Sequence, residues 1–171
     1  MEEQKPTEQD ERVAAAYERI LDNVRDMLDS STELTRQEFD RALKRAGTSL
    51  DEASEFTRKE INRAGDAIRK DWRNLMQAVN QQRDSLLQSD QFQRMAGTSL
   101  GILGNLAKSI KDWAGTVDEK IDAQLSYHTG EIAGPGQFAC TNCGKTLTFQ
   151  KSGRIPPCSA CKNTTFRRKF S

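Results

Sequence analysis

The sequence predicts a mostly α-helical protein: an elongated helical bundle or coiled coil followed by a small C-terminal β domain. Apolar residues recur at spacings of three and four over most of the first 126 residues, which places them on one face of successive helices. These stripes are narrow and rich in alanine, a pattern that favours an elongated bundle over a thick globule. All four cysteines lie instead between positions 140 and 161, among short apolar alternations that are typical of strands.

Charge is distributed unevenly along the chain. The 171 residues are 30% charged and 35% hydrophobic, which is lean for a compact globule and typical of exposed helices. Residues 136–171 hold seven Lys and Arg residues and no acid, so the net charge of +1 leaves −6 for residues 1–135. The chain therefore has an acidic body, residues 1–135, and a basic tail, residues 136–171.

The N-terminal residues indicate a cytoplasmic protein. The start, MEEQKPTEQDER, is acidic and has no apolar core, so we do not expect a secretory signal. The longest uncharged run, residues 95–107, is too short and too rich in glycine to span a bilayer. In a reducing compartment, paired cysteines bind metal more often than they form disulfides.

The first helix is predicted to follow a disordered stretch at residues 1–10. From Val13 to Leu28 the apolar residues share one helix face, and Ser30 and Ser31 then break the pattern. This face consists of Val13, Tyr17, Ile20, Leu21, Val24, Met27 and Leu28.

The second helical stretch is predicted to start at Thr35, because a threonine N-cap with Glu38 three residues later forms a capping box. We expect a break or kink near Gly47, since glycine costs a helix about 1 kcal/mol and Ser49 with Glu52 offers another capping box. The apolar stripe has a mean period of about 3.6 residues, that of a nearly straight helix. It consists of Phe39, Leu43, Ala46, Leu50, Ala53, Phe56, Ile61, Ala64, Ile68, Trp72, Leu75 and Val79.

A third stripe follows, with Ser89 or Asp90 as a suitable N-cap. The stretch AGTSL occurs at residues 46–50 and 96–100, and we interpret both copies as helix-start turns. The third stripe consists of Phe92, Met95, Leu103, Leu106, Ile110, Trp113, Val117, Ile121 and Leu125.

These patterns divide the chain into a helical region at residues 11–126, a hinge at 127–136 and a small domain at 137–171. The hinge is predicted because Gly134-Pro135-Gly136 cannot continue a helix. We interpret the Trp, Met and Phe positions of the helical region as core. If the hinge separates two domains, replacing one cysteine should unfold the small domain and leave the helices intact.

The four cysteines form two C-x2-C pairs, Cys140 with Cys143 and Cys158 with Cys161, separated by fourteen residues. A two-residue spacer lets both sulfurs of a pair reach one ion from a tight turn, and two such turns supply four soft ligands in a tetrahedron, which suits Zn²⁺. Alternation in KTLTFQ and TTFRRKF predicts strands beside these turns. The combination predicts a zinc ribbon with two cysteine turns and about three short strands.

We expect one structural Zn²⁺ in this ribbon. A domain of this size cannot bury enough apolar area to fold alone, so metal binding, worth on the order of 10 kcal/mol, would supply its stability. Four thiolates close the tetrahedron and leave no position for a reactive water. The ligands alone leave an iron centre open as the alternative. His128 would be a fifth ligand, and we expect it to cap the helix or pack at the hinge instead.

The residues around the cysteines form a recognisable pattern: Tyr127-His128-x-Gly130-Glu131, Gly134-x-Gly136, the two cysteine pairs, and Phe166-Arg167-Arg168-x-Phe170. In this pattern, and in Leu34-Thr35-Arg36-x-Glu38, the chain resembles the YbeL-like family of bacterial zinc-ribbon proteins. The resemblance implies a helical N-terminal region, a zinc site at the four cysteines and a bacterial source, and it brings no established activity. Lys162 departs from the glycine that ribbons often have after the second pair, which puts the usual turn geometry in question.

These features favour a non-enzymatic interaction or adaptor protein. The zinc ribbon would be a rigid contact module, and the helical region would associate with itself or with a protein partner. The sequence shows no phosphate loop, nucleophile elbow or paired-carboxylate signature, so we expect neither an enzyme nor a small-molecule substrate.

The alternative function is nucleic-acid binding by the basic ribbon. Seven basic residues without an acid would give a salt-dependent affinity for phosphates, and Phe149, Phe166 or Phe170 could stack on bases. Four thiolates on one Zn²⁺ reduce the charge of this segment to about +5. The candidate contacts to nucleic acid or to a partner are Lys145, Lys151, Arg154, Lys162, Arg167, Arg168 and Lys169.

Overall fold

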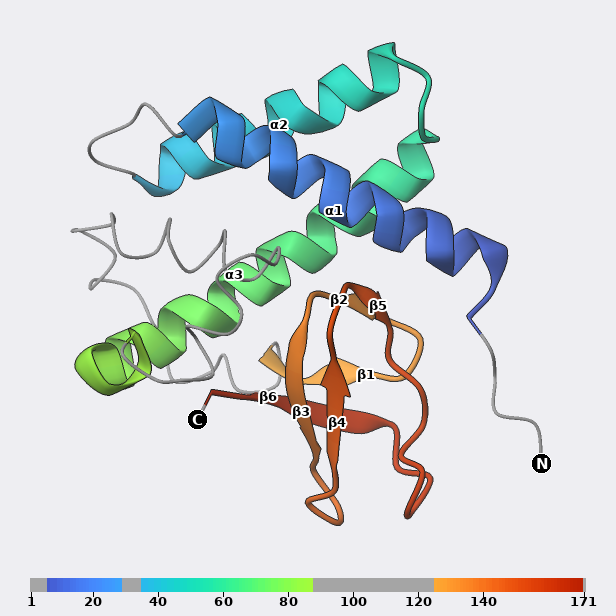
Figure 1. The fold of residues 1–171 in the computed structure, drawn as a ribbon, viewed down its shortest axis with the longest axis vertical. Helices are drawn as coiled ribbons and strands as arrows, with labels where there is room; N and C mark the ends of the chain where they lie inside the picture. The colour runs from blue at the N-terminus through green and yellow to red at the C-terminus, as the bar shows by residue number, and fades with distance from the viewer. Residues whose placement is uncertain (1–5, 29–34, 88–124, 171) are drawn as a thin grey trace.

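The computed structural model describes residues 6–28, 35–87 and 125–170. Within these residues, three helices precede short strands, which form two antiparallel sheets lying against α1 and α3 (Figure 1). The helices are α1 (Glu8–Leu28), α2 (Arg36–Glu52) and α3 (Arg58–Leu87). The strands are β1 (Tyr127–His128), β2 (Ile132–Ala133), β3 (Gly136–Cys140), β4 (Thr146–Phe149), β5 (Gly153–Arg154) and β6 (Thr165–Lys169).

A threonine precedes each described helix and caps its N-terminus. The predicted capping box is confirmed at Thr35, whose backbone N–H donates to Glu38 over 2.8 Å. Thr7 and Asp10 bond in the same reciprocal way at the start of α1, so the predicted disorder of residues 1–10 is wrong for its last three residues. Thr57 and Glu60 form a third box at the start of α3. Each box satisfies two backbone amides that a helix start leaves without a partner.

The break between α2 and α3 does not lie at Gly47. Helix α2 runs through Gly47 to Glu52, so the first AGTSL copy is helix interior and not a helix-start turn. The chain turns instead at Ser54, whose φ of 56° is left-handed. A Cβ on Gly47 would lie 3.1 Å from Ile61 of α3, so this glycine allows close helix packing, and that contact offsets its low helix propensity.

The three helices share one hydrophobic core. The predicted face of α1 is buried, except that Met27 is 41% exposed. In the second stripe, Phe39 stacks on Trp72 with ring centroids 4.3 Å apart, which confirms both as core residues. The apolar stripes of the described helices therefore meet within one chain; the stripe predicted at residues 92–125 lies outside the described residues except for its last position, Leu125, which is buried. None of the described helices is both long enough and apolar enough to cross a membrane.

An ion pair between α1 and α3 should make stability depend on pH. Arg12 donates to Glu60 over 2.7 Å, and this bond, with those from Thr57, lowers the pKa of Glu60 to about 2 against an opposing effect of burial. Because the folded pKa lies below the ordinary 4.5, the pair contributes fully above pH 4.5 and its contribution is lost as the pH falls towards 2. We expect Glu60→Gln, which can still cap α3, to flatten this part of the urea-unfolding stability profile. As a control for the loss of a charge, Glu55→Gln at a more exposed pair with Arg19 should change the free energy of unfolding by less than about 1 kcal/mol.

The ribbon contains a four-stranded sheet in the order β1-β6-β3-β4 and a two-stranded sheet of β2 and β5. The strands predicted in KTLTFQ and TTFRRKF are confirmed as β4 and β6. The predicted alternation of β6 is also confirmed, since Phe166 and Arg168 face inward while Arg167 and Lys169 are exposed. The inward face of the larger sheet and the segment before the second cysteine pair enclose a small core of Tyr127, Ala133, Phe138, Cys140, Ile155, Cys158 and Phe166.

Residues 127–136, predicted as a hinge, are part of the ribbon and pack against the helices. They form β1, β2 and the start of β3, and Ile132 belongs to the helical core. Further along, Ser152 donates its backbone N–H to Glu18 of α1 over 3.0 Å and its hydroxyl to the carbonyl of Ala14. Glycine and proline do stop the helical pattern here, but the segment pairs with strands that lie later in the sequence. The ribbon therefore begins at Tyr127, ten residues before the predicted boundary.

Candidate metal centre

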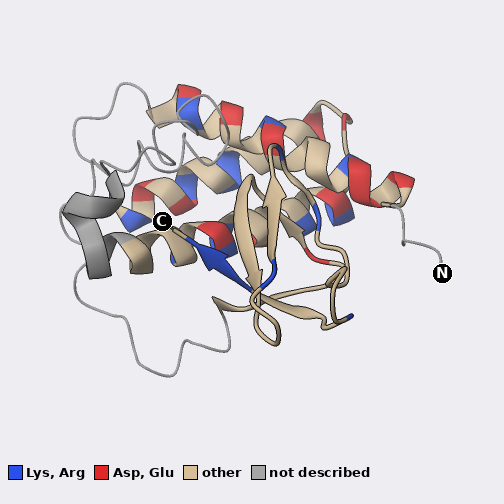
Figure 2. Cartoon of the chain, turned by 60° about the horizontal axis from the view of Figure 1, so that its bottom comes forward, with Lys and Arg blue, Asp and Glu red and all other residues tan. Residues whose placement is uncertain are grey.

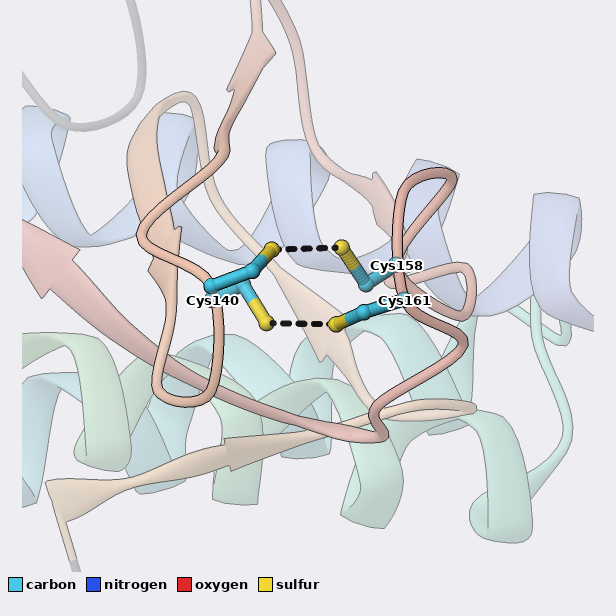
Figure 3. A group of neighbouring side chains, drawn as sticks. Cys140, Cys158 and Cys161 are labelled. Carbon is cyan, nitrogen blue, oxygen red and sulfur yellow. Dashed lines mark hydrogen bonds between the residues drawn. The ribbon is translucent and has the colours of Figure 1, made fainter.

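Two turns of matching geometry carry the cysteines. Cys140 ends β3, and its carbonyl accepts the backbone N–H of Gly144 over 3.0 Å. In the second turn, the carbonyl of Cys158 accepts the N–H of Lys162 over 2.9 Å. Each C-x2-C pair thus closes one tight turn that aims both sulfurs in the same direction. The two turns face each other across the site (Figure 3).

Lys162 keeps the turn geometry despite the missing glycine. Its φ of 62° is close to the 73° of Gly144 at the equivalent place in the first turn. A residue with a Cβ pays a penalty of roughly 1 kcal/mol or more in this left-handed region, whereas glycine does not. The departure from the usual ribbon pattern therefore costs stability and leaves the turn intact.

Replacing Lys162 by glycine should stabilise the metal-loaded protein by up to about 1 kcal/mol, because the left-handed backbone is no longer strained. The reverse change in the first turn, Gly144→Ala, should destabilise by a similar amount. A Cβ at Gly144 would meet nothing within 4 Å, so this variant tests only the strain of a left-handed backbone. Urea unfolding of both variants measures the effect, and a destabilised Lys162→Gly protein would show that the lysine side chain makes a compensating contact.

The four sulfurs are arranged as ligands of a single ion. The sulfurs of Cys140 and Cys161 lie 3.6 Å apart, as do those of Cys143 and Cys158, and all four lie within 4.8 Å of one another. A tetrahedron with metal–sulfur bonds of about 2.3 Å has sulfurs about 3.8 Å apart. These distances exclude disulfide bonds between the cysteines and fit one tetrahedral ion such as Zn²⁺.

Hydrogen bonds prepare part of this site for a cation. Burial raises the pKa of the Cys140 thiol, but hydrogen bonds from the backbone of Cys143 and from the Asn163 amide outweigh it and bring the value to about 6. The Asn163 amide nitrogen lies 3.4 Å from the Cys140 sulfur and 2.9 Å from the carbonyl of Thr165. A thiolate is therefore favoured at Cys140 near neutral pH, and a thiolate is the form that binds metal.

A buried polar cluster, which we call the junction, ties this ribbon to the helices. Its centre is Asp71 of α3, whose side chain is fully buried. One carboxylate oxygen accepts the Tyr17 hydroxyl of α1 over 2.6 Å and the backbone N–H of Gly134 over 2.7 Å. The other accepts the Tyr127 hydroxyl of β1 and the guanidinium of Arg168 of β6, each over 2.6 Å. Asp71 thus accepts four hydrogen bonds from four separate segments.

Arg168 is as fully buried as its partner. Its guanidinium also donates to the carbonyl of Pro135 over 2.7 Å, and it lies over the Phe138 ring at 4.4 Å from the centroid. Burial lowers the pKa of Arg168, but the charge of Asp71 outweighs it and raises the pKa overall. Burial, reinforced by the charge of Asp71, raises the pKa of Tyr17 well above 10. Arg168 therefore stays charged, and Tyr17 and Tyr127, whose pKa burial also raises, stay neutral donors throughout the physiological range.

Gly134 is required by this packing. A Cβ at this position would lie 2.9 Å from the Asp71 carboxylate and still closer to the Tyr17 hydroxyl oxygen. Three residues of the pattern that flanks the cysteines are thereby explained, because Tyr127, Gly134 and Arg168 all meet at Asp71. Glu131 adds a neighbouring contact by accepting Lys70 of α3 over 2.7 Å.

The seven basic residues predicted as contacts fall into two groups. Arg168 is buried in the junction and cannot reach a nucleic acid or a partner, so this assignment is wrong. Arg154 is largely covered and lies 3.5 Å from Asp10 of α1. The basic tail thus binds acids of the helical body through two of its residues, and Figure 2 marks in blue the other Lys and Arg positions along the ribbon. The exposed group is Lys145, Lys151, Lys162, Arg167 and Lys169.

The predicted roles of His128, Phe166 and Phe170 also differ from what the structure shows. His128 lies in β1 with an exposed side chain whose Nδ1 is 3.5 Å from the Thr165 hydroxyl, so it is neither a helix cap nor a metal ligand among the described residues. Phe166 is 1% exposed and Phe170 packs on the helical core, which leaves neither ring available to stack on a base.

Sequence reasoning missed Asp71, although a signal was present. This acid lies within the predicted apolar stripe of the second helical stretch, beside Trp72 and three residues after Ile68. A charged residue at such a position must find a buried partner or leave the core.

A four-cysteine site in facing turns on a small antiparallel sheet, anchored to a helical body, defines the class of zinc-ribbon proteins. The chain matches the family described as a zinc-ribbon containing domain over residues 26–170, and it belongs to that family. Comparison with curated proteins and with solved structures gave no match.

Proposed function

We propose that the protein is a non-enzymatic interaction protein whose ribbon is held in shape by one structural Zn²⁺. The observation that carries this proposal is the pairing of a closed four-sulfur site with the buried junction at Asp71. The metal holds the ribbon turns, and the junction holds the ribbon on the helices. Such an arrangement presents a rigid surface, which reduces the conformational entropy lost on binding a partner.

The metal chemistry supports a structural role. Four cysteine ligands fill a tetrahedral site, so bound Zn²⁺ has no open position at which to activate water or polarise a substrate. Thiolate ligands require a reducing compartment, which agrees with a cytoplasmic location. We retain the closer likeness to YbeL-like bacterial proteins as part of this proposal.

The partner surface is assigned to the ribbon and its border with the helices. The apolar stripes of α1, α2 and α3 are buried against one another and against the ribbon, so these stripes offer little area for self-association. Among described residues, Met27 is the large hydrophobic side chain that remains exposed.

Metal analysis combined with affinity capture tests the function. We expect one zinc per chain by elemental analysis, and less than a tenth of that in Cys158→Ser. The zinc-loaded protein should retain a defined partner protein, and the purified partner should bind again with reproducible stoichiometry. Stoichiometric iron in place of zinc, or the absence of any retained protein that rebinds, would contradict this proposal.

A second candidate function is nucleic-acid binding, favoured by the outer face of the four-stranded sheet. On this face Arg167 pairs in register with Ala139 and Lys169 with Gln137, and Thr146 and Thr148 of β4 are the exposed neighbours. Lysine, arginine, threonine and glutamine are the side chains that contact phosphates, and residues 136–171 contain no acid. The support from this face is electrostatic, because Phe149 packs on Phe138 at the ribbon core and Phe166 and Phe170 are not available for stacking.

Salt dependence separates this candidate from the first. If the outer face binds phosphates, affinity for a labelled single-stranded oligonucleotide should fall steeply between low and physiological salt. The double variant Arg167→Ala/Lys169→Ala should abolish binding, whereas Lys151→Ala, an exposed lysine elsewhere on the ribbon, should change it little. Affinity that is insensitive to salt, or equal in the two variants, would remove nucleic-acid binding by this face.

A further inference from the structure

A groove of about 770 Å³ lies between α1 and the end of β4, where the ribbon meets the helices. Its volume lies in the range of about 300–1,000 Å³ that is usual for ligand sites. Small side chains of α1 leave the space open, and the half-buried ring of Phe149 forms the apolar part of the opposite wall. The groove is lined on the α1 side by Asp10, Glu11, Ala14, Ala15 and Glu18, and on the ribbon side by Thr148, Phe149 and Lys151.

Strand β4 is an edge strand, and its last two residues line this groove. The sheet order places β3 on one side of β4, and none of the described strands pairs with its other side. Unpaired amides and carbonyls of an edge can accept an added strand at a spacing of about 4.8 Å. An extended peptide bound in this way would form main-chain hydrogen bonds with β4 and place alternate side chains in the groove.

A second copy of the chain is a poor occupant of this edge. Lys145 and Lys151 lie just before and just after the edge strand, and both are exposed. Antiparallel pairing of two copies of β4 would bring Lys145 of one copy towards Lys151 of the other. Like charges in such positions are destabilising, and lysines beside an edge are a common device against self-pairing.

The two rims of the groove carry opposite charges. Asp10 is held by Arg63 and Arg154. Glu11 is exposed on the α1 rim, and Lys151 is exposed on the ribbon rim. A complementary segment therefore carries a basic residue towards Glu11 and an acidic residue towards Lys151, on either side of an apolar residue that contacts Phe149.

We propose that this groove binds an extended segment of a partner protein, which adds to the free edge of β4 and places an apolar side chain against Phe149, Ala14 and Ala15. The acidic residue of the segment pairs with Lys151 and the basic residue with Glu11. This inference rests on the proposed function as an interaction protein and locates its binding site.

The test uses the zinc-loaded full chain and a displayed library of random linear peptides as the probe. We expect selected peptides to share an apolar residue between an acidic and a basic one. Ala15→Trp, which fills the groove from an exposed position, should weaken the binding of a selected synthetic peptide by at least about tenfold, or roughly 1.4 kcal/mol. Lys151→Glu should exchange the selected acidic residue for a basic one. Lys59→Glu, the same charge change at an exposed position of α3, should alter neither result.

Other outcomes overturn the proposal. A library that yields no binding sequence, or a peptide that binds the wild-type and Ala15→Trp proteins equally, would show that the groove is not a peptide site. If the wild-type protein is a dimer and Ala15→Trp is a monomer, the groove is occupied by a second copy of the chain. If the wild-type protein binds an oligonucleotide and Ala15→Trp does not, the groove is occupied by a nucleic acid. If a captured partner still binds Ala15→Trp, the groove proposal fails while the interaction function stands.

Discussion

Replacement of Asp71 by alanine is expected to lower the free energy of unfolding by about 3–5 kcal/mol, the cost of breaking a buried ion pair. The change removes the acceptor of four hydrogen bonds and leaves the Arg168 guanidinium charged in a site from which water is excluded. The hydroxyls of Tyr17 and Tyr127 lose their shared acceptor as well. Urea unfolding followed by far-ultraviolet circular dichroism measures this loss.

The same helix provides the control. Asp66 of α3 is 78% exposed at its side chain and lies 3.2 Å from Arg69, so Asp66→Ala should change stability by no more than about 0.5 kcal/mol. Adding Arg168→Met to Asp71→Ala should restore part of the loss, because the uncompensated charge is removed. A loss below about 1 kcal/mol for Asp71→Ala would show that the junction is not closed in solution.

Removal of the metal is expected to destabilise the helices as well as the ribbon. The sequence alone predicted that Cys158→Ser would leave the helices intact, but the junction changes this expectation. Cys140 and Phe166 are register partners on β3 and β6, and Arg168 lies two residues further along β6 at Asp71. Loss of the ion should release these strands, and with them the partners of Asp71 and the Ile132 side chain that completes the helical core.

Thermal melts of the helical circular dichroism signal measure this coupling. A loss of about 2–4 kcal/mol should lower the midpoint by roughly 5–15 °C in a protein of this length. Cys158→Ser should melt at the same lowered temperature with or without a chelator, since its site is already disrupted. In Asp71→Ala, metal removal should shift the helical midpoint much less, because the junction is already broken. Helices that melt identically with and without metal would mean that the two parts are energetically independent.

Local sequence signals predicted the parts of the fold whose interactions are local. The capping box at Thr35 and the cysteine turns depend on residues a few positions apart, so their spacing was sufficient. The same kind of signal was present at Thr7 and Thr57, where boxes of the same type were overlooked. The position of the break after α2 depended on a tertiary contact, since Gly47 faces Ile61 of the next helix.

Strands β1 and β2 and the pairing of Asp71 with Arg168 depend on contacts between segments that lie far apart in the sequence. Strands β1 and β2 are two residues long, too short for a period to be detected, and they exist because β6 and β5 pair with them. Alternation along β6 separated the buried Arg168 from the exposed Arg167, but it gave no indication of the charged group that Arg168 would meet. Its partner Asp71 lies 97 positions earlier in the chain.

The sequence alone was sufficient to predict the four cysteines that could hold one metal ion, the helical character of the first half and the apolar faces of the described helices, because these follow from residue types at short, regular spacings. The docking of the ribbon on the helices and the choice of basic residues that remain at the surface depend on tertiary contacts. The physical reason is that a charge enters a protein interior only with a partner, and the partner of Arg168 is supplied by a helix far away in the sequence.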